Sequence, residues 1–395
     1  MSNGRGERPQ ARIPPGARPA AAGTCGEAPR PDRRRDGERI VVVSADIGAG
    51  HDAAAAELAA RLALDGVEVH HLNFFTSLPK PLHRVIREGY RALLRWCPLS
   101  YDALFTVTDR SPPLVATIRA ALRPARRRML MQMPPDIGLV VSTFPFANQV
   151  LGPLRHSGRL GAPVVTYVTD FVIHPTWLAT GVDTYCVIHE ATRQQAAVRG
   201  APNVQLVDPL VPARYQPPTD ATRHAARAQF ALPEQGRLAL IVAGSWGAGD
   251  VARTAREVLA AGCVTPVVVC GRNGSLRRRL AGLPGHVMGW VDDMPTLMQA
   301  VDLVVENAGG LTCQQALAAG LPTITYRPIP GHGRANAQVL AGAGLTTYVR
   351  DPADLCQELT RAAVPTAPAF TSAADVAAIV SATLRAGVGP DGNPQ

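Results

Sequence analysis

A histidine follows two closely spaced glycines in the stretch SADIGAGHDAAAAEL. Gly48 and Gly50 let the backbone turn sharply and approach a ligand closely. His51 comes next, at the expected first turn of a helix, where the helix dipole disfavours protonation of the imidazole. A neutral imidazole can accept a proton, so His51 is a candidate general base. The alternative is a structural histidine that only hydrogen-bonds across the loop.

These residues belong to a β-α-β unit. Four apolar residues at 40–43 predict a buried strand, the apolar spacing over 53–64 predicts a helix, and 67–72 reads as a second strand. N–H groups at the start of such a helix bind anions or polar groups. We therefore expect a ligand at this turn.

A similar unit begins at residue 238. A strand at 238–243 leads into the loop GSWGAG, then a helix to about residue 261 and a strand at 267–270. Further helices and strands alternate regularly: 294–300, 303–305, 312–319, 323–326 and 335–341. Such alternation predicts an α/β fold of two similar halves, each with a doubly wound parallel sheet, and a ligand cleft between them.

Composition changes suggest the domain boundaries. Residues 1–38 form an Arg/Pro/Gly-rich tail, 39–208 the first domain, 209–235 a Pro-rich linker with one helix, 236–368 the second domain, and 369–395 a C-terminal helix and tail. The tail lacks the apolar core of a signal peptide, and no stretch of 18 residues is apolar throughout. These features predict a cytoplasmic protein.

Charge and cysteine usage narrow the function. The net charge of +9 favours anionic partners such as phosphates or acidic lipids. The seven cysteines form no C-x-x-C pair, which argues against a zinc site or a disulfide framework. No nucleic-acid-binding motif accompanies the basic tail. The G-x-G-x-x-A spacing fits the fingerprint of a dinucleotide-binding enzyme. The second strand, however, ends HHLNFF without the carboxylate that would hold a ribose, which argues against a nicotinamide-dependent enzyme.

Five stretches together resemble the monogalactosyldiacylglycerol synthase family, which includes the processive diacylglycerol glucosyltransferases. They are SADIGAGHDAAAAEL, VSTFPFANQVL, VTYVTDFVIHPTWLATGVDTYCV, VVVCGRNGSL and the segment from GWVDDM to GHGRANAQVL, in family order. The family is related to the transferase that completes the lipid-linked peptidoglycan precursor. The resemblance implies a GT-B fold of two Rossmann-like domains. It also implies inverting transfer of a hexose from a UDP-sugar to a diacylglycerol-like lipid, with no metal cofactor; in agreement, the sequence has no D-x-D motif.

On the acceptor side, the resemblance assigns His51 as the base. Asp170 either assists it or caps the turn after the strand at 164–168. Gly48, Gly50, Phe171, His174 and Trp177 would line the acceptor site, although the last two fit simple packing equally well. The donor contacts implied by the resemblance are Gly244, Ser245, Gly247, Arg272, Val291, Gly309, Gly310, Leu311, Thr312, Gln315, Gly331, His332 and Asn336. Arg272 fits a solvated surface charge equally well.

Two donor motifs depart from the family. Gln315 stands where the family has a glutamate that grips the ribose hydroxyls, and charge-assisted hydrogen bonds are roughly twice as strong as neutral ones. The sugar-contacting PGQEE is replaced by PGHGR at 330–334, without either acid. We expect a weaker or altered donor preference, and the identity of the sugar does not transfer.

The segment 82–97 carries an apolar stripe beside a basic one. The basic stripe is Arg84, Arg87, Arg91 and Arg95. This pattern is typical of an interfacial helix, and it predicts contact with an anionic membrane surface, on the inner face of the cell membrane. A core-packed helix with a solvated basic face is the alternative.

Two alternatives to lipid glycosylation stay open. The divergent PGHGR loop suits a transferase acting on a soluble metabolite, and the missing acids suit a GT-B-shaped binding protein without turnover. The sequence does not indicate an oligomeric state.

Overall fold

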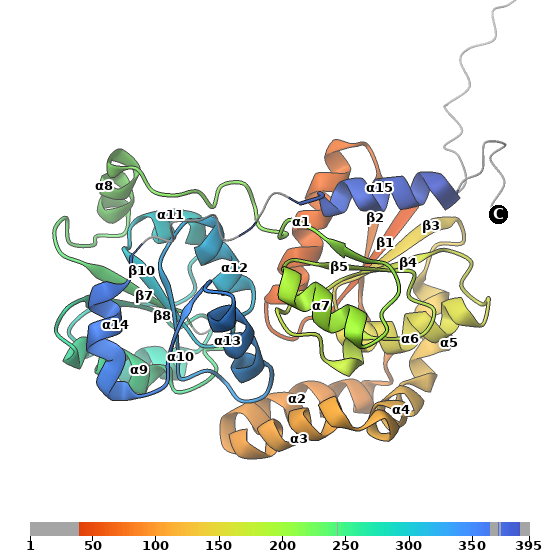
Figure 1. Ribbon diagram of the computed structural model, residues 1–395, viewed down its shortest axis with the longest axis horizontal. Coiled ribbons are helices and arrows are strands. Elements are labelled where there is room, and N and C mark those ends of the chain that lie inside the picture. The colour runs from red at the N-terminus through yellow and green to blue at the C-terminus, as the bar shows by residue number, and fades with distance from the viewer. Residues whose placement is uncertain (1–38, 243, 364–369, 371–372, 388–395) are drawn as a thin grey trace, which may run out of the picture. The chain divides into compact units, whose positions relative to one another are not determined.

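The computed structural model describes residues 39–242, 244–363, 370 and 373–387. All of them belong to one compact unit, Asp36–Gln395. They form two halves, each built on a six-stranded sheet with helices around it (Figure 1). Every strand pair in both sheets is parallel. The prediction of two doubly wound α/β halves is therefore confirmed.

The first sheet has the strand order β2-β1-β3-β4-β5-β6. Its strands are β1 (Arg39–Ser44), β2 (Glu68–Asn73), β3 (Ile137–Ser142), β4 (Val164–Tyr167), β5 (Thr184–Val187) and β6 (Val204–Leu206). The central strand β1 is apolar without alternation because both of its faces are covered. Val41 and Val43 pack into one core cluster, while Ile40 and Val42 pack into the cluster on the opposite face.

The second sheet has the order β12-β11-β10-β7-β8-β9. Its strands are β7 (Leu238–Val242), β8 (Thr265–Val269), β9 (His286–Met288), β10 (Leu303–Glu306), β11 (Thr323–Tyr326) and β12 (Thr347–Val349). In both halves the sequence order reverses next to a central strand. Ligands of open α/β sheets bind at the carboxyl ends of the strands at such a point.

Helices cover both sheets. They are α1 (Gly50–Leu64), α2 (Lys80–Trp96), α3 (Pro98–Arg110), α4 (Pro112–Ala121), α5 (Arg123–Gln132), α6 (Pro145–His156), α7 (Glu190–Val198), α8 (Asp220–Gln229), α9 (Val251–Ala260), α10 (Gly274–Leu280), α11 (Met294–Gln299), α12 (Leu311–Ala318), α13 (His332–Gly342), α14 (Leu355–Arg361) and α15 (Val376–Gly387). Short 3-10 turns are η1 (Phe74–Ser77), η2 (Pro175–Trp177) and η3 (Pro352–Asp354). Both α1 and α13 begin three residues before the expected start, directly after a glycine-containing turn.

The last helix returns to the first half. Val376, Ala377 and Val380 of α15 pack into the cluster that also holds Ile40 and Val42, and Figure 1 shows α15 beside α1. The helix expected in the 209–235 segment is α8, whose Ala226 packs into a core cluster of the second half. The tail at 1–38 lies outside the described residues.

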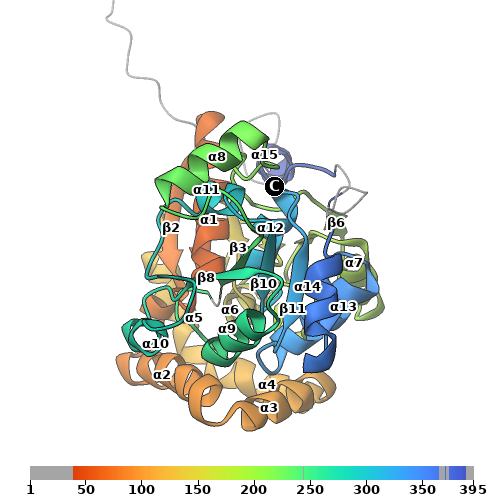
Figure 2. The ribbon, with the colours of Figure 1, turned by 90° about the vertical axis from the view of Figure 1, so that its left-hand side faces the viewer.

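Helices α2, α3 and α4 lie together along one edge of the structure in two perpendicular views (Figures 1 and 2). They occupy the long connection between β2 and β3. Within the described part of the chain, no helix combines the length and apolarity needed to cross a membrane.

Candidate active site

A cavity of about 820 Å³ lies between the two halves and is lined by both of them. Its size suits a ligand of drug-like or nucleotide dimensions. The sequence-predicted residues on its wall are Gly48, Gly50, His51, Asp170, His174, Trp177, Gly244, Ser245, Val291, Gly310, Leu311, Thr312, Gln315 and His332. Residues far apart in the chain therefore meet where the sequence predicted a cleft.

His51 stands in the first turn of α1, after Gly48, whose φ of 83° suits glycine. Its Nδ1 lies 2.6 Å from the carbonyl oxygen of Thr143, and 3.3 Å from the hydroxyl of Thr169. A carbonyl can only accept, so Nδ1 carries the hydrogen and Nε2 is left as the acceptor nitrogen. This is the tautomer that a general base facing the cavity needs.

The charge state of His51 also suits a base. Burial lowers the pKa of His51 below its ordinary value of 6.5, and the Asp170 carboxylate opposes part of that shift. The hydrogen bond to the Thr143 carbonyl and the Asp52 carboxylate also raise the pKa of His51, and His332 lowers it. The imidazole is therefore neutral at pH 7 and ready to accept a proton.

Asp170 follows β4 and is held on both carboxylate oxygens. Trp177 Nε1 donates to Oδ2 at 3.2 Å, and Asn336 Nδ2 donates to Oδ1 at 3.3 Å. Trp177 is 1% exposed, and its ring centroid lies 6.1 Å from that of His51. Asp170 and Trp177 thus form one polar contact beside the candidate base.

Two predicted acceptor residues behave differently. His174 lies on the cavity wall, where its Nε2 is 3.1 Å from the Thr108 hydroxyl and its ring packs 4.5 Å from that of Phe105. Phe171 is fully buried in a core cluster with Cys313 and Leu317 of the second half. Its side chain therefore does not line the cavity, contrary to the acceptor role predicted for it.

A buried carboxyl group shapes the donor-side glycine turn. Glu306 ends β10, and its Oε2 accepts hydrogen bonds from the amides of Ala308 (2.8 Å) and Gly309 (2.5 Å). The Gly309 amide is thereby occupied, and Gly309 is absent from the cavity lining. Gly309 therefore does not present its amide to the cavity as the prediction expected. Gly310 and the start of α12 face the cavity instead, with Leu311 and Thr312.

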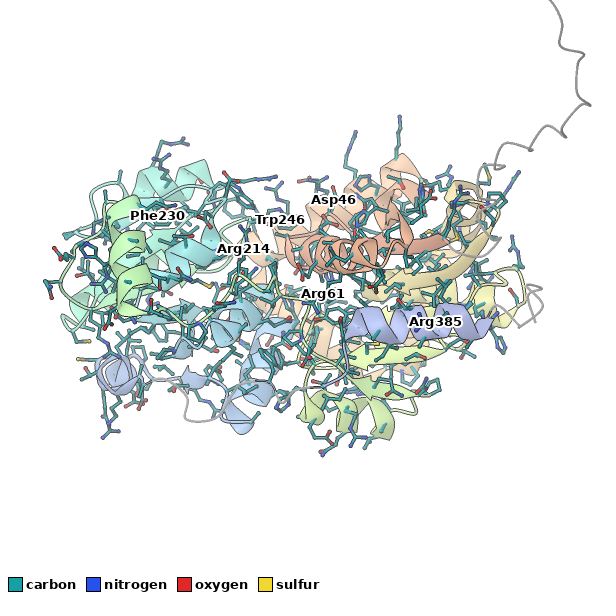
Figure 3. The ribbon with its side chains drawn as sticks, turned by 90° about the horizontal axis from the view of Figure 1, so that it is seen from above. Asp46, Arg61, Arg214, Phe230, Trp246 and Arg385 are labelled. Carbon is teal, nitrogen blue, oxygen red and sulfur yellow. The ribbon has the colours of Figure 1, made fainter. Side chains whose placement is uncertain are left out.

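The second glycine loop presents Gly244 and Ser245 to the cavity, together with Trp246. Gly247 turns away from it, with φ of 59°, and a Cβ there would lie 3.0 Å from the Cβ of Asn273. Its glycine is needed for this close packing and not for donor contact. Figure 3 labels Trp246 at the junction of the two halves.

Arg272 reaches the cavity only through an aromatic ring. Its guanidinium carbon lies 4.5 Å from the centroid of the Trp290 ring, a cation–π contact. Trp290 and Val291 line the cavity, whereas Arg272 does not. Arg272 is thus an exposed charge that stacks on Trp290 and does not contact the cavity directly.

The PGHGR loop is held by α3. Tyr101 Oη lies 3.0 Å from His332 Nδ1, and Asp102 accepts hydrogen bonds from the Gly331 amide (2.7 Å) and from Arg334 Nη1 (2.6 Å). Gly331 is packed against Tyr101 and does not line the cavity. Burial lowers the pKa of His332, so its ring is neutral at pH 7. Asp102 therefore supplies a carboxylate to the loop that lacks its own.

Asn336 is the clearest departure from the predicted donor set. Its side chain is fully buried. Oδ1 accepts from the amides of Phe171 and Val172, both at 3.0 Å, and Nδ2 donates to Asp170 and to the Ala308 carbonyl. An amide side chain has two donor hydrogens and two acceptor positions, and all four are used. None is left for a donor sugar.

The arginines of the basic stripe of α2 differ in their surroundings. Arg84 is exposed, but Arg87 Nη1 lies 2.9 Å from Asp46 Oδ2, and the Arg91 guanidinium lies 4.9 Å from the Trp246 ring centroid. The side chain of Arg95 lies outside the described set. Arg87 and Arg91 thus have partners within the protein, contrary to a uniformly membrane-facing stripe.

The apolar stripe of α2 faces inward. Leu82 and Ile86 pack against a core cluster, and Ile86 and Tyr90 line the cavity. Among the described residues, no group of three or more His, Cys, Asp or Glu side chains could hold a metal ion.

Sequence reasoning missed several cavity residues. Glu306 could have been found from the sequence, because it is an acidic residue at the end of an apolar strand, just before a glycine pair. Trp246 also had a signal, as an aromatic residue inside a glycine loop. Tyr101, which lines the cavity, and Asp102, which does not line it but holds the PGHGR loop, had no such signal. Their role depends on contact with a loop about 230 positions later, a separation of 229 for Asp102 and Gly331.

The chain is similar in sequence to known glycosyltransferases. Residues 51–208 match the monogalactosyldiacylglycerol (MGDG) synthase family, and residues 238–366 match the glycosyltransferase family 28 C-terminal domain. A processive diacylglycerol beta-glucosyltransferase of Bacillus cereus is 26% identical over 337 residues, which cover 80% of this chain and 83% of the relative.

Solved structures share the fold. The crystal structure of LpCGTa in complex with UDP aligns with a TM-score of 0.51 and 16% identity, over 88% of this chain and 93% of that one. Arabidopsis thaliana UGT89C1 complexed with UDP-L-rhamnose aligns with a TM-score of 0.50 and 12% identity, over 90% and 96%. The chain is therefore similar to the MGDG synthases over residues 51–208 and to the family 28 glycosyltransferases over residues 238–366, and it shares the GT-B fold of glycosyltransferases.

Proposed function

We propose that this protein is an inverting glycosyltransferase that moves a hexose from a UDP-sugar to a diacylglycerol-like lipid. The observation that carries the proposal is the shared cavity. It brings the acceptor nitrogen of His51, on the first half, to the same space as the start of α12, on the second half. The relatives named for diacylglycerol glucosylation support the choice of acceptor.

The reaction is a single displacement at the anomeric carbon. The acceptor hydroxyl oxygen forms the new bond to that carbon, its proton passes to His51 Nε2, and the bond to the UDP oxygen breaks with its electron pair. Asp170 stabilises the imidazolium that forms. Attack from the face opposite the leaving group inverts the anomeric configuration.

Backbone amides would stabilise the departing diphosphate. Gly310, Leu311 and Thr312 open α12 on the cavity wall, and a helix start offers N–H groups and a favourable dipole to an anion. We propose that this replaces a divalent metal ion in charge stabilisation, so that activity persists in a chelator.

Apolar and aromatic side chains form the acceptor wall. Phe105, Phe144 and Phe146 line the cavity on the first half, and the Phe144 ring centroid is 5.1 Å from that of His51. Such a wall suits the apolar portion of a lipid better than a polar metabolite.

A panel of UDP-sugars tests the function directly. The purified protein is incubated with each donor and diacylglycerol-containing vesicles, and the products are read by mass. A mass increase of one hexose in the lipid supports the proposal. Transfer only to water-soluble acceptors, or UDP binding without any turnover, would overturn it.

Gln315 offers a test of donor recognition. It lines the cavity in the second turn of α12. If it faces the ribose, Gln315→Glu adds an ionised acceptor and should tighten UDP binding by about 1 kcal/mol, or about fivefold in Kd. Calorimetric titration measures this, with Gln315→Met as the matched variant that cannot accept and should bind more weakly. An unchanged or weaker affinity in folded Gln315→Glu would show that another group reads the ribose.

We also propose that the protein works at a membrane surface, on the cytoplasmic face. Helices α2 and α3 expose apolar side chains: Val85 is 67% exposed, Leu99 75% and Val107 53%. Arg84 is exposed on the same pair of helices. Exposed apolar groups beside a cation are the features that bind an anionic interface.

Vesicle binding should follow from that surface. We expect binding to anionic vesicles to weaken as salt rises, because the attraction of an exposed arginine is screened over about 8 Å at physiological ionic strength. Leu99→Glu should weaken binding further. The matched control is Leu64→Glu, which is 87% exposed, against 75% for Leu99, but lies at the C-terminal end of α1 and outside the cavity lining. Equal vesicle binding by both variants, at every salt concentration, would place the membrane contact elsewhere.

A further inference from the structure

Asn336 joins two loops that belong to different halves of the protein. It lies on α13, and Figure 1 shows α12 and α13 on the side of the second half that faces the first. Its Oδ1 holds the amides of Phe171 and Val172, which follow β4 in the first half. Its Nδ2 holds the Ala308 carbonyl, just before the glycine turn of the second half.

The same amide also reaches a charged cavity residue. Asn336 Nδ2 donates to Asp170 Oδ1 at 3.3 Å, and Trp177 Nε1 donates to the other oxygen of that carboxylate. The two donors approach from different halves. Because each oxygen has its own donor, the plane of the carboxylate is fixed beside His51.

The backbone around Asn336 is built for this contact. A Cβ added to Gly309 would lie 2.5 Å from the Cβ of Asn336, so only glycine lets the turn lie against α13. The turn therefore packs directly on the residue that holds Asp170. Movement of one loop relative to the other would break hydrogen bonds of a fully buried side chain, which is costly.

We propose that Asn336 is a positioning residue, which fixes the Asp170 carboxylate in the cavity and couples the acceptor-side loop at 170–172 to the donor-side glycine turn. The inference rests on the proposed function. It gives Asn336 a role different from contact with the donor. Gly310 and the start of α12 bind the diphosphate, and Asn336 holds Asp170 and its loop at a fixed position relative to them.

A matched pair of variants separates positioning from general packing. Gln314 is a second buried amide that crosses between the halves, and its Nε2 donates to the Thr169 carbonyl at 2.8 Å without a described hydrogen bond to Asp170. Asn336→Asp and Gln314→Glu make the same chemical change, each placing an oxygen where an N–H group donated. Only the first turns an oxygen toward Asp170.

We expect Asn336→Asp to lower kcat by about 10- to 100-fold, the cost of misplacing a reacting geometry by about an ångström. The Kd for UDP should change less than about threefold, and Gln314→Glu should keep kcat within a few-fold of the parent. Equal losses of kcat in the two variants, at equal thermal stability, would make Asn336 a packing residue. A loss of UDP affinity matching the loss of kcat would make it a donor contact.

Hydrogen exchange gives a readout that does not depend on turnover. In Asn336→Ala the amides of Phe171 and Val172 should exchange faster, because their acceptor is gone, whereas Gln314→Ala should leave them protected. Unchanged protection in Asn336→Ala would overturn the inference. A parent protein that transfers no sugar would overturn the proposed function alone, because the exchange result still decides whether Asn336 holds the loop.

Discussion

His51→Ala is expected to reduce sugar transfer by roughly 10²-fold or more, the scale of losing general-base assistance, while UDP binding stays nearly unchanged. The reason is geometric. The Thr143 carbonyl accepts the hydrogen on Nδ1, so Nε2 is the basic nitrogen of His51, which lines the cavity. Initial rates with saturating donor and lipid measure the loss, and calorimetry with UDP shows that the donor half stays folded. Near-parental turnover would remove His51 from the reaction.

The pH dependence gives a second reading of the same residue. Burial lowers the pKa of His51 below 6.5, and the nearby Asp170, Asp52 and His332 modify that shift. A base works only when deprotonated, so kcat/KM should be flat near pH 7 and fall as the pH drops through the lowered pKa. The acid limb should therefore lie below pH 6.5 in the parent and be lost in His51→Ala. A limb well above pH 7 would assign it to another group.

The local parts of this site are readable from the sequence. The strand at 303–305 and the helix at 312–319 are marked by apolar runs and a glycine pair, and the structure places β10 and α12 within one residue of those bounds. Such signals are local because a glycine turn and a helix start depend on neighbouring residues. The same holds for His51, which follows its glycines directly.

Contacts between the two halves cannot be predicted from local sequence patterns. The α2 segment carries both an apolar and a basic stripe, and nothing in its periodicity tells which stripe meets protein. The structure turns Ile86 into the cavity and gives Arg87 and Arg91 partners in Asp46 and Trp246. Asn336 likewise matches the donor motif by its position in the sequence, but its side chain hydrogen-bonds to Asp170 and to the loop after β4.

The PGHGR loop is held by a carboxylate from a distant part of the chain, which does not line the cavity. Sequence comparison along the loop indicates a loss of both acids. In the folded protein, Asp102 on α3 accepts from Gly331 and Arg334, so a carboxylate again lies against this loop. Because it comes from the acceptor half, the shape of the loop depends on both halves.

Glu306→Ala is expected to destabilise the protein by about 2–5 kcal/mol, because the amides of Ala308 and Gly309 lose their acceptor and a buried unsatisfied donor costs about 1–3 kcal/mol. The Thr325 hydroxyl also donates to Glu306, but it has Thr346 as a second partner at 3.3 Å. Loss of its bond to Glu306 therefore adds less to the loss of stability. UDP binding should weaken as well, since the turn before Gly310 loses its support. Urea unfolding and calorimetry measure the two effects.

The matched variant for this prediction is Glu306→Gln. Its carbonyl oxygen can keep both amides, while its NH₂ group donates to Thr325, whose hydroxyl turns to Thr346. Burial raises the pKa of Glu306 above its ordinary value of 4.5, against hydrogen bonds from Thr325, Gly309 and Ala308 that lower it. The neutral amide therefore resembles the protonated acid, and Glu306→Gln should cost less than about 1 kcal/mol.

The raised pKa of Glu306 also determines in which direction the stability of the protein changes with pH. A carboxyl group that binds its proton more tightly when folded stabilises the protein fully below the unfolded pKa, and this stabilisation is lost as the pH rises through the folded pKa. The parent should therefore lose stability over that window relative to Glu306→Gln, which has no proton to release. Parallel stability curves for the two proteins from pH 4 to 8 would mean that Glu306 stays ionised in the fold. In that case its oxygens hold the glycine turn as a carboxylate, and Glu306→Gln should cost as much as the loss of a charged acceptor.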